Sequence, residues 1–293
     1  MVLGLALGSG GARGWCHIGV LRALEEQGLR PDVIAGCSMG ALVGAAWAAD
    51  RLDALEDWAL SLTQTRFLQY LDLSIRKGGL VQGRAVQTIL HEIGLPERIE
   101  DLKHPYLAVC TDMATGREVW LQKGPLIPAI RASIAIPGVF SPQEMGGRWM
   151  LDGGLVNPVP MSGLRALGAT TTVAVNPNAR TGHALWKPQT QPDIWKRLAI
   201  EDLKPHLPDQ LISFLGEGPT EKSPDYIDVV NTSIDIMIDY VRKTREAADP
   251  PHLKLDADLQ HISVLELYRA QEAIEEGHRI AQGAADRIAS DLS

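Results

Sequence analysis

The feature that most constrains this chain is a G-x-S-x-G pattern at residues 36–40, with Ser38 at its centre. The residues before it are typical of a short buried strand, and residues 41–49 after it are typical of an apolar helix. A strand, a tight glycine turn and a helix together predict a nucleophile elbow, which lifts the serine oxygen clear of the backbone. Gly36 and Gly40 keep side chains away from that oxygen, and the helix directs its N-terminal amides at charge developing beside it. Ser38 is therefore the candidate nucleophile; the alternative is a serine that only caps the helix.

The periodicity of the first half of the chain predicts an α/β domain. Residues 2–7 are a continuous apolar run, which suits a strand buried on both faces of a parallel sheet. Residues 17–27 follow with apolar side chains at helical spacing. Strands and helices then alternate as far as a β-branched strand at residues 171–175. This alternation is typical of an α/β fold with a largely parallel sheet.

Beyond residue 177 the composition shifts, and the patterns become mainly helical. Helices are predicted over residues 227–248 and 264–289, with one strand-like piece at residues 253–255 between them. The organisation we expect is a catalytic domain over residues 1–177 and a mainly helical C-terminal region over residues 178–293, packed on the same domain.

Charge and cysteine content exclude several classes of function. Lys and Arg number 28 against 36 Asp and Glu, a net charge of −8, so no broad basic field exists to hold nucleic acid. The cysteines Cys16, Cys37 and Cys110 are odd in number and lie in apolar surroundings, which indicates reduced thiols in a cytoplasmic protein. There is no C-x-x-C or H-E-x-x-H pattern and no N-terminal segment typical of a signal peptide. We therefore expect no metal and no cofactor.

A second glycine-rich loop occupies residues 8–14, between the first strand and the first helix. Such a loop presents backbone N–H groups to an anion. A dinucleotide site would need an acidic residue after the second strand, and a phosphate-binding P-loop would need G-K-[ST]; both are missing here. An oxyanion hole for the neighbouring elbow explains both loops together, because adjacent parallel strands bring their carboxyl ends to one edge of the sheet. The alternative is glycine present only for close packing of helix on strand.

A serine nucleophile needs a base, and the candidate is Asp152. It ends a predicted strand and is followed by Gly153 and Gly154, which allow a sharp turn. A carboxylate beside a serine hydroxyl can accept its proton if the surroundings raise the carboxyl pKa toward neutrality. An aspartate before two glycines is also a common turn, so the residues alone leave both interpretations open. None of the late histidines follows a strand in an obvious glycine turn; these are His183, His206, His252, His261 and His278.

The ordered motifs resemble those of the patatin-like phospholipases, most closely their short bacterial branch related to the catalytic domain of neuropathy target esterase. The resemblance rests on the glycine loop, the serine elbow, residues 131–140 and the Asp-Gly-Gly turn, and it covers residues 2–176. It implies a three-layer α/β/α patatin-like fold with a mostly parallel sheet. It also implies a Ser38–Asp152 dyad without histidine. The oxyanion hole would consist of Gly10, Gly11 and Ala12, with Arg13 near and Gly14 completing the motif. One departure is Ser9, where the wider family often has a further glycine.

By this resemblance the chain is expected to hydrolyse acyl esters of phospholipids or lysophospholipids without a metal. Substrate would come from a membrane or micelle, which implies transient contact at the inner face of the membrane. Residues 58–60 and 67–71 are candidates for that contact, with core packing as the alternative. Three rival functions stay open: a Ser-His-Asp carboxylesterase, a non-catalytic lipid-binding or regulatory protein, and a nucleotide-binding module. The sequence predicts no particular oligomeric state.

Overall fold

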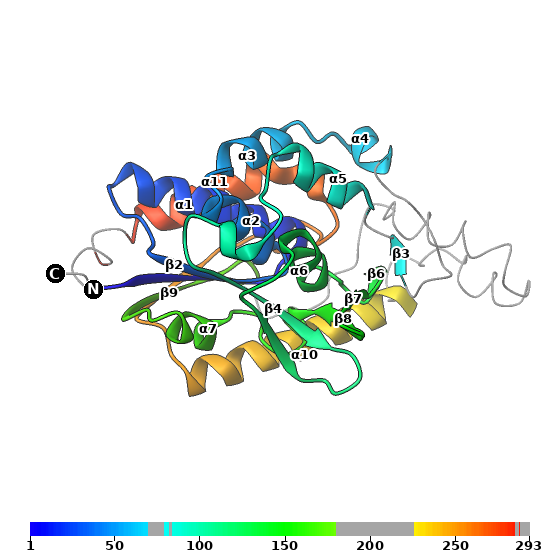
Figure 1. Ribbon diagram of the computed structural model, residues 1–293. Coiled ribbons are helices and arrows are strands. Elements are labelled where there is room, and N and C mark those ends of the chain that lie inside the picture. The colour runs from blue at the N-terminus through cyan, green and yellow to red at the C-terminus, as the bar shows by residue number, and fades with distance from the viewer. Residues whose placement is uncertain (70–78, 82–83, 180–225, 285–286, 288–293) are drawn as a thin grey trace, which may run out of the picture.

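The computed structural model describes residues 1–69, 79–81, 84–179, 226–284 and 287. Within them an eight-stranded sheet lies between two layers of helices (Figure 1). Its strand order is β10-β9-β1-β2-β4-β8-β7, with β5 paired to β4. The predicted three-layer α/β/α fold is confirmed, and so is its mostly parallel sheet.

The parallel part of the sheet positions the loops that follow its strands. Strands β1, β2, β4 and β9 are buried along their whole length, whereas β10 at the edge alternates between buried and exposed residues. Burial on both faces explains the nearly continuous apolar runs of β1 and β2 in the sequence. The bounds of the parallel strands are β1 (Leu3–Leu7), β2 (Val33–Cys37), β4 (Tyr106–Asp112), β9 (Thr171–Asn176) and β10 (Leu253–Asp256).

Antiparallel strands extend the sheet beyond β4. Strands β5 (Glu118–Leu121) and β8 (Arg148–Asp152) both pair with β4, and β7 (Gln143–Met145) pairs with β8. A separate two-stranded sheet joins β3 (Gly79–Val81) to β6 (Gly138–Phe140) in parallel. The antiparallel β8 carries Asp152 back toward the carboxyl ends of the parallel strands.

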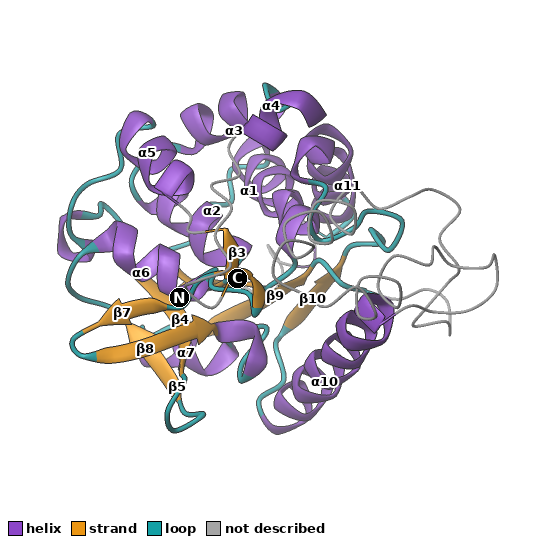
Figure 2. Ribbon diagram, turned by 90° about the vertical axis from the view of Figure 1, so that its right-hand side faces the viewer, coloured by secondary structure: helices purple, strands orange, loops and turns teal. Residues whose placement is uncertain are grey.

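The helices cover both faces of the sheet, and the two views agree on their division (Figures 1 and 2). One layer contains α1 (Cys16–Glu26), α2 (Met39–Ala48), α3 (Leu52–Leu60), α4 (Gln64–Gln69), α5 (Arg84–Glu92), α6 (Leu126–Ser133) and α11 (Ala270–Gln282). The opposite layer contains α7 (Met161–Ala166) and α10 (Tyr226–Ala248). None of the helices in the described part of the chain is both long and apolar enough to span a bilayer.

Helix α11 begins later than the sequence pattern predicts. The pattern predicts a helix from residue 264, but α11 starts at Ala270 after a 3₁₀ turn and ends at Gln282. The carbonyl of Val264 accepts the N–H of Ala12, and the carbonyl of Leu267 accepts the indole N–H of Trp15. Because these carbonyls are bonded to the first loop and its helix, this segment follows the glycine loop instead of the helical path.

The other predicted elements of the C-terminal region agree with the structure. Helix α10 and strand β10 lie where the sequence places them, and β10 joins the main sheet beside β9. The division between residues 177 and 178 stays a prediction.

The two segments considered for contact with a lipid surface are only partly described. Trp58 is half-buried and stacks edge-on against Trp15 with ring centroids 6.0 Å apart, Ala59 is buried, and Leu60 is exposed. Residues 70 and 71 of the second segment lie outside the described residues. Residues 66–83 have an irregular, apolar sequence that suits either a substrate-facing flap or plain packing, and most of them lie outside the described residues.

Helices α1 and α11 pack so closely that no side chain fits between them at two positions. A Cβ atom added to Gly277 would lie 1.9 Å from the carbonyl oxygen of Cys16, and one added to Gly19 would lie 1.9 Å from that of Ile274. Both obstacles are backbone atoms of the opposite helix, which cannot swing aside as a flexible side chain could. The pairing of α1 with α11 therefore depends on these glycines.

We predict that Gly277→Ala lowers the free energy of unfolding by about 1–3 kcal/mol, because overpacking forces the two helices apart. Gly283→Ala is the matched control at the C-terminal end of the same helix. Its backbone is right-handed and its added Cβ would find only Arg279 O at 4.0 Å, so we expect a change within about 0.5 kcal/mol. Urea denaturation measures both variants. Equal stability of the two would contradict the close helix contact.

Candidate active site

Strand β4 brings the two predicted reacting residues together. Cys37, the last residue of β2, pairs with Val109 of β4, and Asp152, the last residue of β8, pairs with the next residue, Cys110. Strands β2 and β8 run in opposite directions, so their carboxyl ends meet beside β4. Ser38 follows Cys37 directly, which places the serine and the aspartate at this junction.

Ser38 adopts the backbone conformation that the elbow requires. Its φ of 55° lies in a region that side-chain-bearing residues rarely occupy. The residue lies between β2 and α2, and its carbonyl accepts hydrogen bonds from the amides of Ala41 and Leu42 in the first turn of α2. The turn also needs Gly40, because an added Cβ there would lie 2.0 Å from the carbonyl oxygen of Leu7. The turn thus combines a strained backbone at Ser38 with close contact between Gly40 and the end of β1.

The Ser38 hydroxyl donates a hydrogen bond to Asp152 in a buried setting. The distance between Ser38 Oγ and Asp152 Oδ2 is 2.6 Å, and the two residues are 2% and 5% exposed. The other carboxylate oxygen, Oδ1, accepts the amide of Gly154 at 2.7 Å. Thr111 Oγ1 donates to the Asp152 carbonyl at 2.8 Å. Asp152 is therefore fixed at both its side chain and its backbone.

Burial makes this carboxylate a stronger base than an exposed aspartate. It raises the pKa of Asp152 from 3.8 to about 6, against the hydrogen bonds from Ser38 and Gly154, which lower it. A base with a pKa near neutrality combines a large ionised fraction with a useful affinity for a proton. The site can thus accept a proton from Ser38 without a histidine between the two residues.

Ser133 connects the elbow to β4, a contact that the sequence analysis did not assign. Its Oγ accepts the N–H of Ser38 at 2.9 Å and donates to the carbonyl of Val109 at 2.6 Å. The side chain is fully buried. This bridge satisfies the Ser38 amide at the strained position. The motif at residues 131–133 pointed to this serine, but its role depends on the position of β4, which no local pattern reveals.

The glycine loop lies beside the elbow, and its backbone is held at several points. The amide of Gly8 donates to Val175 O at 3.0 Å, and the amide of Ser9 donates to Pro158 O at 2.8 Å. His17 Nε2 lies 2.8 Å from Gly8 O, and because a carbonyl can only accept, Nε2 carries the proton. Burial lowers the pKa of His17 to about 4, so the ring stays neutral. The sequence analysis assigned no role to His17.

Two of the four predicted oxyanion-hole positions already have their amides bonded. The Ala12 amide donates to Val264 O at 2.8 Å, and the Arg13 amide donates to Gly10 O at 3.2 Å. The amides of Gly10 and Gly11 have no hydrogen-bond partner among the described residues. These two are therefore the donors that the loop leaves available to an anion.

The remaining motif glycines lie where other atoms approach closely. The nearest neighbours of an added Cβ would be Ala41 and Gly40 at Gly36, Met39 at Gly14, the Val109 carbonyl at Gly153, and Asp152 and Ser9 at Gly154. Ser9, the departure from the wider family, therefore lies next to the turn that carries Asp152.

The late histidines within the described residues are bonded away from Ser38. His252 contacts Thr172, His261 pairs with Glu272, and His278 pairs with Glu26. His183 and His206 lie outside the described residues.

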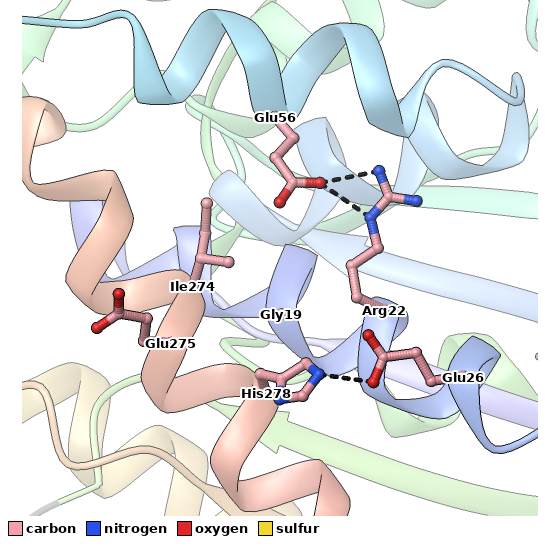
Figure 3. Close-up of a pocket in the computed structure, with 7 residues that line it drawn as sticks. All are labelled: Gly19, Arg22, Glu26, Glu56, Ile274, Glu275 and His278. Atoms are coloured by element: carbon pink, nitrogen blue, oxygen red, sulfur yellow. Dashed lines mark hydrogen bonds and ion pairs between the residues drawn. The ribbon is translucent and has the colours of Figure 1, made fainter.

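A shallow cavity of about 400 Å³ lies elsewhere, between α1, α3 and α11 (Figure 3). Charged side chains line it, among them Arg22 paired with Glu56, and His278 paired with Glu26. None of the predicted site residues borders it. In the part of the chain that the structure describes, no group of three or more His, Cys, Asp or Glu side chains is arranged to hold a metal ion. All three cysteines are free and buried.

Comparisons with known proteins show the family to which the chain belongs. The family model described as Patatin-like phospholipase matches residues 5–165. An uncharacterised NTE family protein of Mycobacterium tuberculosis is 51% identical over 174 residues, which is 59% of this chain and 48% of that protein. Patatin-like phospholipase domain-containing protein 6 of Homo sapiens is 31% identical over 255 residues, covering 80% of this chain and 18% of that protein. The alignment thus spans about half the length of the mycobacterial relative.

A solved structure is also similar at low identity. The crystal structure of VipD from Legionella pneumophila has a TM-score of 0.47 and 14% sequence identity, covering 98% of this chain and 67% of that one.

The raised pKa of Asp152 predicts a pH-dependent cost in stability. The folded protein holds the Asp152 carboxyl proton more tightly than the unfolded chain does. The stability that this protonation contributes is therefore complete below pH 3.8 and is lost as the pH rises through about 6. We predict that Asp152→Asn raises the free energy of unfolding at pH 8 by about 3 kcal/mol, since each unit of pKa shift is worth about 1.4 kcal/mol. The gain should vanish near pH 4, as urea denaturation at the two pH values will measure.

Asp112 provides a control of opposite sign. It is also buried, at the end of β4. Although burial raises its pKa, hydrogen bonds from the Thr115 and Ala114 amides outweigh that effect and lower it. Asp112→Asn should therefore destabilise the protein at pH 8. If Asp152→Asn also lost stability at pH 8, the result would contradict the conclusion that burial makes the ionised Asp152 carboxylate unfavourable.

Proposed function

The chain belongs to the patatin-like phospholipase family, and from this premise we propose that it is a serine acyl-ester hydrolase. Its substrates are fatty acyl esters of phospholipids or lysophospholipids. The observation that carries the proposal is the buried 2.6 Å hydrogen bond from Ser38 Oγ to Asp152 Oδ2, made by a serine with φ of 55°. Strained backbone is a common property of reacting residues, and a buried carboxylate with a raised pKa is a competent base.

In the proposed reaction Ser38 is the nucleophile and Asp152 is its base. Asp152 takes the hydroxyl proton as Oγ attacks the ester carbonyl, and a tetrahedral oxyanion forms. The carbonyl re-forms as the alcohol leaves with a proton from Asp152, which gives an acyl-enzyme. Water then repeats the attack with the same carboxylate as base, releasing the fatty acid and restoring Ser38.

The proposed oxyanion donors are the amides of Gly10 and Gly11, with the N-terminal turn of α2 adding its positive end. These two amides have no hydrogen-bond partner in the part of the chain that the structure describes, which supports this choice, whereas the Ala12 amide is bonded to Val264. Loss of one such donor typically costs about 10²–10³ in kcat. Arg13 contributes through its side-chain contacts rather than as a donor to the oxyanion.

We predict that a fluorophosphonate probe labels the folded protein at Ser38 and that Ser38→Ala abolishes the label. Asp152→Asn should also abolish it, because an amide cannot take the proton. Mass spectrometry of the tryptic peptides locates the adduct. Ser61→Ala is the control and should keep the label, since Ser61 is exposed and its hydroxyl donates to the Trp58 carbonyl, away from the elbow. Absence of an adduct on folded protein, as judged by circular dichroism, would refute the hydrolase and favour a lipid-binding role.

We predict that kcat/KM for p-nitrophenyl butyrate rises with pH through about 6, the pKa of Asp152, and then stays level. Below that pH the carboxyl carries a proton and cannot accept another. His183→Ala and His206→Ala should leave the rate unchanged. A large loss in either variant would support a Ser-His-Asp esterase instead. Release of fatty acid from mixed micelles of phosphatidylcholine or lysophosphatidylcholine then tests the lipid substrate.

A further inference from the structure

The glycine loop is held by residues that lie far along the chain. Arg13 Nε donates to the carbonyl of Ile262 at 2.7 Å, and the Ala12 amide donates to the carbonyl of Val264 at 2.8 Å. Trp15 Nε1, at the end of the same turn, donates to Leu267 O at 3.1 Å. We call the backbone of residues 262–267 the C-terminal anchor. It accepts hydrogen bonds from the turn that directly follows Gly10 and Gly11.

Asn178 completes this arrangement from a third part of the chain. Its Nδ2 donates to Ser9 O at 2.6 Å, and its Oδ1 accepts from Arg13 Nη1 at 3.0 Å. One amide side chain thus connects the two ends of the loop, before and after the paired glycines. The Asn178 backbone is in turn fixed by Asn176 Oδ1, which accepts its amide at 3.1 Å.

The fit between loop and anchor leaves no space at Gly11. This residue has a φ of 53°, and an added Cβ would lie 2.2 Å from Val264 O. The anchor therefore lies directly against the backbone of one of the two proposed oxyanion donors. A side chain at this position would push the loop and the anchor apart.

The anchor has supports of its own. Ile262 is fully buried, and the Ser263 amide donates to Glu266 Oε2 at 2.8 Å. Arg269 Nη1 donates to the carbonyl of His261 at 2.9 Å. These contacts do not involve the glycine loop, so the anchor is a firm surface against which the loop can be held.

A glycine-rich loop needs such a support if it is to bind an oxyanion. Glycine has more backbone freedom than any other residue, and an oxyanion hole is effective only when its donors are fixed before the reaction. Within the loop the Arg13 amide donates to Gly10 O, and residues 11–15 form a short 3₁₀ turn. Asn178 and the anchor then hold this turn against parts of the protein that lie far along the chain.

We propose that Arg13, Asn178 and the C-terminal anchor form a positioning device that orients the amides of Gly10 and Gly11 toward the oxyanion. This inference rests on the proposed hydrolase function for its effect on rate. The anchoring itself is independent of that function. Arg13 is a positioning residue, because both of the side-chain nitrogens described above contact the protein's own carbonyl groups. The described part of the C-terminal region therefore contributes to the site by holding the glycine loop.

The test compares Arg13→Met with Arg165→Met. Arg165 is a matched control: it also joins the first part of the chain to the C-terminal region, through Asp249 and the Pro250 carbonyl, but it does not touch the glycine loop. We expect Arg13→Met to lower kcat for p-nitrophenyl butyrate about 10- to 100-fold with little change in KM, as a small misplacement of a catalytic group does. Arg165→Met should keep the wild-type kcat.

Amide hydrogen exchange of the peptides covering residues 8–16 gives a second measurement that does not depend on activity. Arg13→Met should speed exchange in these peptides, and Arg165→Met should not. Asn178→Asp is the milder variant in case Arg13→Met fails to fold. It keeps an oxygen that can accept from Arg13, but it replaces the Nδ2 donor to the Ser9 carbonyl with a second acceptor. We expect it to change both measurements in the same direction and by less.

The outcomes separate the two proposals. If the wild-type protein hydrolyses no ester and takes no probe, the proposed function fails, and exchange alone decides whether the loop is anchored. Faster exchange in Arg13→Met alone supports the device. Unchanged exchange in folded Arg13→Met and Asn178→Asp overturns it, and so does a fall in kcat without a change in exchange, because the effect would then lie outside the loop.

Discussion

The register of β4 is the constraint on which the proposed site depends. Neighbouring residues of this strand pair with Cys37 and with Asp152, so the ends of two oppositely directed strands meet at a fixed separation. The hydrogen bond from Ser38 to Asp152 then requires no further adjustment of either backbone. Ser133 adds to the same alignment, since it bonds both the Ser38 amide and the Val109 carbonyl. A shift of β8 by one residue would turn the Asp152 side chain to the other face of the sheet, because side chains alternate along a strand.

The site places its two unfavourable features side by side. Ser38 occupies a strained backbone conformation, and Asp152 must be ionised in a buried position to act as a base. Both are tolerated because the surrounding strands are buried along their whole length and hold the residues in place. The hydrogen bonds from Ser38 and the Gly154 amide recover only part of the cost of burying the carboxylate, since the pKa still lies well above its ordinary value. The stability of the sheet thus makes the proposed Ser38–Asp152 pair possible.

The sequence predicts the local parts of this arrangement well and the long-range parts poorly. The strand, the glycine turn and the helix around Ser38 are encoded within about a dozen residues, and the turn after Asp152 within three. The fold class follows from the alternation of strands and helices. The late start of α11 could not be predicted, because the carbonyls of Val264 and Leu267 bond partners some 250 residues earlier. For the same reason, no local pattern shows that the amide of Ala12 is already occupied or that Arg13 reaches Ile262. The predicted roles of Ser38 and Asp152 stay predictions until they are tested chemically.

These long-range contacts change how the C-terminal region should be viewed. The family model ends at residue 165, and the strongest sequence motifs lie before residue 155. Strand β10 nevertheless extends the sheet beside β9, and α11 packs on α1 through paired glycines. The segment between β10 and α11 then borders the glycine loop, whose Gly10 and Gly11 amides are the proposed oxyanion donors. A fragment that ended near residue 177 would keep Ser38 and Asp152 but would lose the acceptors for Ala12, Arg13 and Trp15. Its glycine loop would then be free to occupy many conformations, of which few could bind an oxyanion. The proposed reacting pair and the anchor that holds its proposed oxyanion donors are thus encoded in different halves of the chain.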